Sequence, residues 1–188
     1  APAPRVLVIG SGAGAEVLEA LRLGAQRVTA LEVNPIIVET VRRDPFWGDL
    51  FHRADVELHA TEARSFIRRT EASYDLIVSV HTISNAAMAA GALALAESHI
   101  LTLEAFADYL ERLGPRGLLY ITRPEAQLPR LVATARSALE GAGVLEPERS
   151  VFAWRARPPR PGARSFSAGL VIRRAPFTPE ERAAMAGA

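Results

Sequence analysis

The chain has 188 residues, 49% of them hydrophobic, so it is long enough to bury one substantial core. The formal net charge is only +1, and bulk charge therefore identifies no partner. The sequence contains no cysteine, which excludes disulfides, a thiolate nucleophile and cysteine-ligated metal sites within this chain. It also contains no lysine, which excludes a P-loop lysine, a Schiff-base lysine and a lysine general base.

Targeting and membrane signals are missing from the sequence. No apolar run approaches the roughly 18–20 residues that a membrane-spanning helix needs. No signal peptide precedes the first predicted strand, so we expect a cytoplasmic protein. We expect one domain over residues 1–188, and because residue 1 is not methionine, this domain could belong to a longer chain.

The first predicted unit is a strand, a glycine-rich turn and a helix. Residues 6–9 are all apolar, which is typical of a strand buried on both faces, and residues 17–21 have helical spacing of apolar side chains. Glycines between the two allow a sharp turn and close approach of a ligand to the backbone. The turn consists of Gly10, Ser11, Gly12, Ala13 and Gly14.

The second predicted strand, residues 27–32, ends in a carboxylate, Glu32. It lies about 20 residues after the first glycines, the spacing at which an acidic side chain accepts hydrogen bonds from ribose hydroxyls. The alternatives are that Glu32 is a solvated strand end and that the glycine turn is purely structural. Because turn and carboxylate occur together in this register, we favour a ligand site.

A third strand is predicted over residues 56–60, and Glu62 follows it at the start of a short helix. Open α/β sheets bind their ligands beyond the carboxyl ends of the strands, which makes Glu62 a candidate ligand residue. An acidic residue in the first turn of a helix is also favoured by the helix dipole alone. The pattern does not separate these two interpretations.

The fourth predicted strand, residues 74–80, is another apolar run and is therefore expected at the centre of the sheet. Residues 81–99 are rich in alanine and small polar residues, which predicts either a helix or a lid over the strand ends. His81 stands where a strand-end residue would face a substrate, and it is a weak candidate for catalysis. A lone histidine is more often structural.

The C-terminal half continues the strand–helix alternation and ends in a hairpin. Thr102 caps an amphipathic helix, a fifth strand is predicted over residues 118–121, and two strands are predicted over 151–156 and 166–172. Thr178 begins a capping box for a last helix. The whole pattern predicts an α/β protein: a Rossmann-like, doubly wound, mostly parallel seven-stranded sheet with a C-terminal antiparallel hairpin strand.

Several motifs, taken in order, resemble those of the class I S-adenosylmethionine (SAM)-dependent methyltransferases, and more narrowly their spermidine synthase-like branch. Residues 59–67 (HATEARSFI) are similar to that branch's H-x-G-D-G/A-R-x-F-L motif, and residues 74–78 (YDLIV) to its Y-D-h-I-h strand. Residues 101–106 (LTLEAF) and 113–117 (LGPRG) resemble its L-T-x-E-F helix and L-x-P-x-G turn. The resemblance covers nearly the whole chain, and the order of the motifs is more specific than any one of them.

The resemblance implies roles for the first glycine turn and for the end of the second strand. Gly10, Gly12 and Gly14 would line the methionine and ribose side of SAM or decarboxylated SAM, with Ser11 in the same turn. Glu32 would hold the ribose hydroxyls.

The resemblance also implies roles for three residues further along the chain. Glu62, where the family has aspartate, would meet the adenine amino group, with Ala63 beside it. Ser79, at the end of the fourth strand, would border the sulfonium. No metal is implied.

The sequence departs from the spermidine synthases at the acceptor site. They place a D-x-x-D pair after the fourth strand, where residues 80–84 here read VHTIS, and no carboxylate occurs between Asp75 and Glu97. Ala13 replaces the aspartate of the family's glycine turn, and the N-terminal β-hairpin domain is absent from this sequence. Aminopropyl transfer uses a carboxylate to bind and deprotonate the attacking amine, so we expect methyl transfer rather than polyamine aminopropyl transfer.

Two other interpretations stay open at the level of sequence. One is a non-catalytic descendant that binds a nucleoside or a partner protein, and the other is an NAD-binding domain, because Ala15 fits the third position of G-x-G-x-x-G/A. The expected partner is a small-molecule acceptor, and a homodimer is possible. The arginines near the C-terminal hairpin are more simply a solvated face than a nucleic-acid site.

Overall fold

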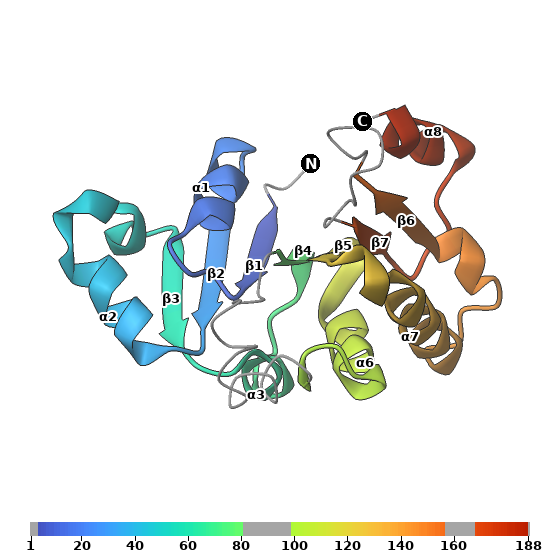
Figure 1. Cartoon of the computed structure of the whole chain (residues 1–188), viewed down its shortest axis with the longest axis horizontal. Helices are drawn as coiled ribbons and strands as arrows, with labels where there is room; N and C mark the ends of the chain where they lie inside the picture. The colour runs from blue at the N-terminus through green and yellow to red at the C-terminus, as the bar shows by residue number, and fades with distance from the viewer. Residues whose placement is uncertain (1–3, 81–98, 157–167, 188) are drawn as a thin grey trace.

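The computed structural model describes residues 4–80, 99–156 and 168–187. Seven strands of this part form one sheet in the order β3-β2-β1-β4-β5-β7-β6 (Figure 1). Their bounds are β1 Arg5–Ile9, β2 Arg27–Glu32, β3 Val56–Ala60, β4 Tyr74–Ser79, β5 Leu113–Arg123, β6 Val151–Arg155 and β7 Ala168–Ile172.

The strand directions confirm the predicted topology. β1 pairs in parallel with β2 and β4, and the outer pairs β2–β3 and β4–β5 are parallel as well. β7 pairs antiparallel with both β5 and β6, so it alone of the seven runs against the others. The predicted central place of the fourth strand is also confirmed, since β4 lies in the middle of the seven and its Val78 pairs with Val8 of β1.

Helices cover both faces of the sheet and give it two cores. α3, α6 and α7 pack on one face together with Leu7 and Ile9, whereas α1 and α2 pack on the other together with Val6 and Val8 (Figure 1). Burial on both sides explains why β1 is a continuous apolar run. The helices are α1 Ala15–Arg22, α2 Pro35–Arg43, α3 Ala63–Arg69, α6 Leu103–Arg112, α7 Leu128–Gly141 and α8 Pro179–Gly187. Among the helices of the described ranges, none has the length and apolar character that a membrane-spanning segment requires.

β5 begins earlier than the sequence predicts. Leu113 already pairs with Tyr74, whereas Leu118 pairs with Leu76, so the register shifts and β5 has a bulge between its two paired parts. Gly117 is required there, because a Cβ at this position would lie 2.7 Å from the carbonyl oxygen of Tyr74. The predicted L-x-P-x-G turn is therefore a bulged strand start rather than a separate turn.

The predicted C-terminal capping box is present. The Thr178 amide donates to Oε2 of Glu181 (2.8 Å), and the Glu181 amide donates to Oγ1 of Thr178 (3.2 Å). The same Glu181 carboxylate is bound by the guanidinium of Arg173, a buried residue that directly follows β7. This ion pair fixes α8 against the end of the sheet.

Candidate functional site

The glycine turn after β1 is tied to the end of β2. The amides of Gly10 and Ser11 both donate to the carbonyl oxygen of Leu31, at 2.8 and 2.9 Å. Gly10, Gly12 and Gly14 have φ values of 74°, 47° and 92°, a region that L side chains rarely adopt. These contacts hold the turn at the edge of the sheet where the parallel strands end.

Glu32 is fixed beside this turn by two backbone amides. Its Oε2 accepts from Gly12 (3.1 Å) and its Oε1 accepts from Asn34 (2.8 Å). The residue is 8% exposed, so the alternative of a solvated strand end is wrong. Each carboxylate oxygen has a further lone pair, and the group can therefore accept hydrogen bonds from a pair of hydroxyls while the turn keeps its shape.

Ser11 supplies a second polar group in the turn. It is 2% exposed, and its Oγ has no hydrogen-bond partner in the described part of the chain. Buried polar side-chain atoms usually have a partner, so an unpartnered hydroxyl beside a fixed carboxylate fits a site for a polar ligand.

Glu62 is the N-cap of α3. Its Oε1 accepts from the amide of Arg64 (2.8 Å) and its Oε2 from the amide of Ser65 (2.7 Å). Burial alone would raise the pKa of Glu62, but these hydrogen bonds, one from the Ser65 hydroxyl and the charge of His99 together lower it. Glu62 thus caps α3 one position before the first turn, where the dipole interpretation places it, and contact with adenine remains a prediction. Ala63, the first residue of α3, is buried beside it.

A buried cation lies at the end of β5, and the sequence reasoning missed it. Arg123 is 4% exposed, and its guanidinium donates to the carbonyl oxygen of Thr122 (2.6 Å) and to Oγ of Ser79 (3.5 Å). Ser79, the last residue of β4, is itself 2% exposed. The bond between these side chains joins the ends of two neighbouring strands.

The candidate residues therefore lie along one edge of the sheet. In the order of the strands, this edge carries Glu62 after β3, Glu32 on β2, the glycine turn after β1, Ser79 on β4 and Arg123 on β5. With neighbouring strands about 4.8 Å apart, the distance from β3 to β5 is about 19 Å. This length allows a nucleoside and a second small molecule to lie side by side.

Two predictions on the site stand apart from this description. His81, the weak catalytic candidate, lies outside the described residues, as do residues 81–98 of the helix or lid predicted over residues 81–99. Within the described ranges, no cluster of three or more metal-ligating side chains occurs.

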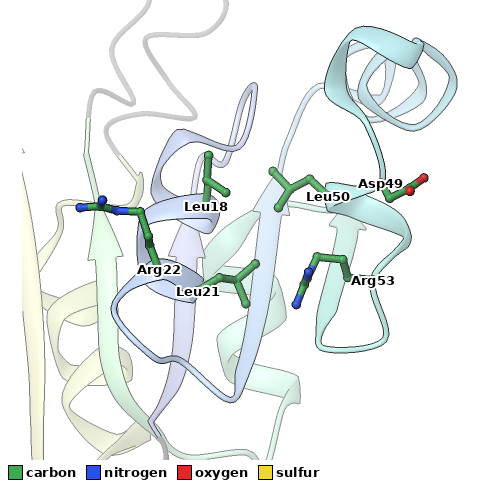
Figure 2. Close-up of a pocket in the computed structure, with 6 residues that line it drawn as sticks. All are labelled: Leu18, Leu21, Arg22, Asp49, Leu50 and Arg53. Atoms are coloured by element: carbon green, nitrogen blue, oxygen red, sulfur yellow. The ribbon is translucent and has the colours of Figure 1, made fainter.

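An open groove lies on the flank of the molecule, between α1 and the short helix η2 Leu50–His52 (Figure 2). Its volume is about 470 Å³, and it contains none of the eight predicted ligand residues. It adjoins the glycine turn through Leu50, because a Cβ on Gly14 would lie 2.8 Å from Cδ2 of that residue. The groove is lined by Leu18, Leu21, Arg22, Asp49, Leu50 and Arg53.

Comparison with known proteins gives a match at the level of structure. No family model matches the sequence, and no curated protein is significantly similar to it. A spermidine synthase in complex with the transition-state analogue AdoDATO superposes with a TM-score of 0.66 at 15% identity, over 96% of this chain and 56% of that one. This chain thus spans little more than half the length of that enzyme.

Two methyltransferases superpose almost as well. They are a ribosomal protein L11 methylase from Lactobacillus delbrueckii subsp. bulgaricus (TM-score 0.60, 18% identity, 92% of this chain and 71% of that one) and a SAM-dependent methyltransferase from Agrobacterium tumefaciens (0.61, 18%, 92% and 56%). Identities this low establish the fold alone. The described part of this chain therefore shares its fold with these SAM-dependent methyltransferases and with spermidine synthase.

Proposed function

We propose that this chain binds SAM at the carboxyl edge of β1 and β2 and transfers its methyl group to a small-molecule acceptor. The observation that carries the proposal is the buried carboxylate of Glu32, which Gly12 and Asn34 fix beside the glycine turn. The fold shared with known SAM-dependent enzymes supports it, as does the unpartnered hydroxyl of Ser11.

Different residues of this edge would contact different parts of SAM. Glu32 would accept hydrogen bonds from the ribose hydroxyls, and the glycines would let the backbone approach the methionine part closely. Glu62 and Ala63 would contact the adenine, and Ser79 would border the reactive end. The sulfonium supplies the chemistry of methyl transfer, so the protein has to align donor and acceptor and keep water out.

Aminopropyl transfer to a polyamine is the less favoured alternative. A diamine acceptor needs carboxylates to hold one ammonium and to deprotonate the other, and the sequence has none between Asp75 and Glu97. The described end of β5 instead carries the guanidinium of Arg123.

Calorimetry with four ligands separates the candidate functions. We titrate the wild type and a Glu32→Gln variant with SAM, decarboxylated SAM, methylthioadenosine and NAD. The substitution places an amide N–H₂ against one of the two backbone N–H groups that donate to Glu32. We expect SAM to bind, and Glu32→Gln to weaken its binding by about 1–3 kcal/mol, because a charged acceptor is lost.

The matched control is Glu57→Gln, which changes a half-exposed carboxylate on β3 that pairs with Arg27. It should leave the affinity for SAM unchanged. Binding of NAD without SAM would refute the proposal, and so would equal affinity of wild type and Glu32→Gln for SAM. Binding of SAM without methyl transfer to any acceptor would instead indicate a non-catalytic nucleoside-binding module.

A further inference from the structure

The guanidinium of Arg123 is an unusual feature of the sheet edge. Arg123 is only 4% exposed at the last position of β5, and charged side chains are seldom buried to this extent without partners. Its guanidinium donates to the carbonyl oxygen of Thr122 and to Oγ of Ser79, and the side chain takes part in further interactions. A guanidinium has five N–H donors in a rigid planar fork, so it can hold several partners at once.

The place of Arg123 in the sheet relates it to the acceptor. If ribose lies against Glu32 on β2 and the methionine part over the turn after β1, the reactive end points toward β4, whose last residue is Ser79. β5 is the next strand beyond β4, and strands are about 4.8 Å apart. The end of β5 is therefore beside the reactive end, on the side away from the nucleoside.

The charged side chains along this edge change from negative to positive in going from β3 and β2 to β5. Among the described residues, the part of the edge that would bind the nucleoside carries two carboxylates, Glu32 and Glu62. The end of β5 carries the guanidinium of Arg123. A polyamine placed there would bring like charges together, which is costly. An anionic oxygen group would form charge-assisted hydrogen bonds, which are bidentate when arginine meets a carboxylate or a phosphate.

Ser79 adds a second hydrogen-bond donor where the ends of β4 and β5 adjoin. Its Oγ accepts from Arg123, so its own hydroxyl hydrogen can be donated to a ligand. Because Ser79 and Arg123 are both almost fully buried, an ion pair formed there would be only weakly screened by salt.

We propose that the acceptor is a small molecule with an anionic oxygen group, a carboxylate or a phosphate, and that Arg123 and Ser79 bind this group. This inference rests on the proposed function and adds the substrate class. It does not require Arg123 to be without other partners, since one edge of the guanidinium is enough to bind an anion.

Binding of simple probes tests the inference. Benzoate, inorganic phosphate and putrescine are titrated into the protein at constant ionic strength, with and without saturating S-adenosylhomocysteine, and affinity is followed by calorimetry. We expect benzoate and phosphate to bind and putrescine not to bind. In Arg123→Gln the affinity for both anions should fall at least about tenfold, which corresponds to about 1.4 kcal/mol.

The matched control is Arg155→Gln, which removes a 67%-exposed guanidinium that pairs with Glu125 at the end of β6. It should leave the affinity for both anions unchanged. Preference for putrescine, no detectable anion binding, or equal anion affinity of wild type and Arg123→Gln would overturn the inference.

A second variant keeps the test valid if Arg123→Gln does not fold. Arg123→Lys retains a point charge but not the planar fork, so it should lose more affinity for the planar benzoate than for phosphate. Unchanged affinity for benzoate in this variant would overturn the role of Arg123. If S-adenosylhomocysteine itself fails to bind, the proposed function fails, whereas the titrations without it still measure the anion site.

Discussion

Gly14 is the residue of the glycine turn against which Leu50 and Phe51 of η2 pack. Its replacement by alanine tests how closely η2 packs against this turn. Two costs are expected at this position. The φ of 92° is strained for any L side chain, by about 1–2 kcal/mol. The added Cβ would also lie 2.8 Å from Cδ2 of Leu50 and 2.8 Å from Cζ of Phe51, more than half an ångström inside ordinary contact at 3.4 Å.

The chain contains a matched control for the first cost. Gly24 has a φ of 93°, but a Cβ built on it meets no atom within 4 Å. Gly24→Ala should therefore show the backbone strain alone, and any gain from a stiffer unfolded chain is the same in both variants. Since Phe51 is buried and its ring cannot bend away, we assign about 1–3 kcal/mol of additional cost to Gly14→Ala.

Urea unfolding of the two variants measures this difference. For a domain of this size, 1 kcal/mol corresponds to roughly 2–4 °C in Tm, so thermal unfolding gives an independent check. Phe51→Leu removes the ring atoms, and the double variant with Gly14→Ala should lose less stability than the two single changes added together. Equal destabilisation by Gly14→Ala and Gly24→Ala would refute the claim that η2 packs against the turn.

The remaining predictions concern Glu62 and Gly169. Because the pKa of Glu62 is lowered in the folded state, its contribution to stability is present above its ordinary pKa of 4.5 and is lost as the pH falls through the lower folded value. Urea midpoints measured from pH 6 to pH 3 should therefore fall more steeply for the wild type than for Glu62→Gln, and parallel curves would contradict this. Gly169→Ala should destabilise the hairpin by several kcal/mol, because its Cβ would lie 2.5 Å from the carbonyl oxygen of Ile121 and 3.0 Å from the ring of Trp154. Gly141→Ala, at the end of α7 with open space around it, should cost nothing in the same unfolding assay.

The central strands could be predicted from the sequence because both of their faces are buried. Residues 6–9 alternate between the two cores, so every position must be apolar, and this leaves an unambiguous signal in the chain. The position of Glu32 was predictable for a related reason, since a buried strand that ends in a carboxylate has to place it at the edge. Its two amide partners were not predictable, because they depend on how the turn folds back over β2.

Arg123 shows where such reasoning ends. A charged residue directly after an apolar strand usually indicates that the chain is leaving the core for solvent, and the sequence contains no signal against that interpretation. Its burial results from the arrangement of the neighbouring strands, because Ser79, at the end of β4 and 44 residues earlier in the chain, lies beside its guanidinium. The early start of β5 was hidden similarly, since the glycine and proline of a bulge have the composition of a turn.

The proposed anion site also predicts which part of the acceptor is methylated. An oxygen anion that is paired with Arg123 and hydrogen-bonded to Ser79 has its lone pairs engaged, so it is a weakened nucleophile. Such a group holds the acceptor in place, and the atom that attacks the methyl group has to be a different one, directed from β5 toward the end of β4. A hydroxyl, amine or ring carbon of an anionic acceptor would meet this requirement. We therefore expect the methylated product to keep its carboxylate or phosphate unmodified, as mass spectrometry and NMR of the product would show, whereas a methyl ester would mean that Arg123 does not bind that group.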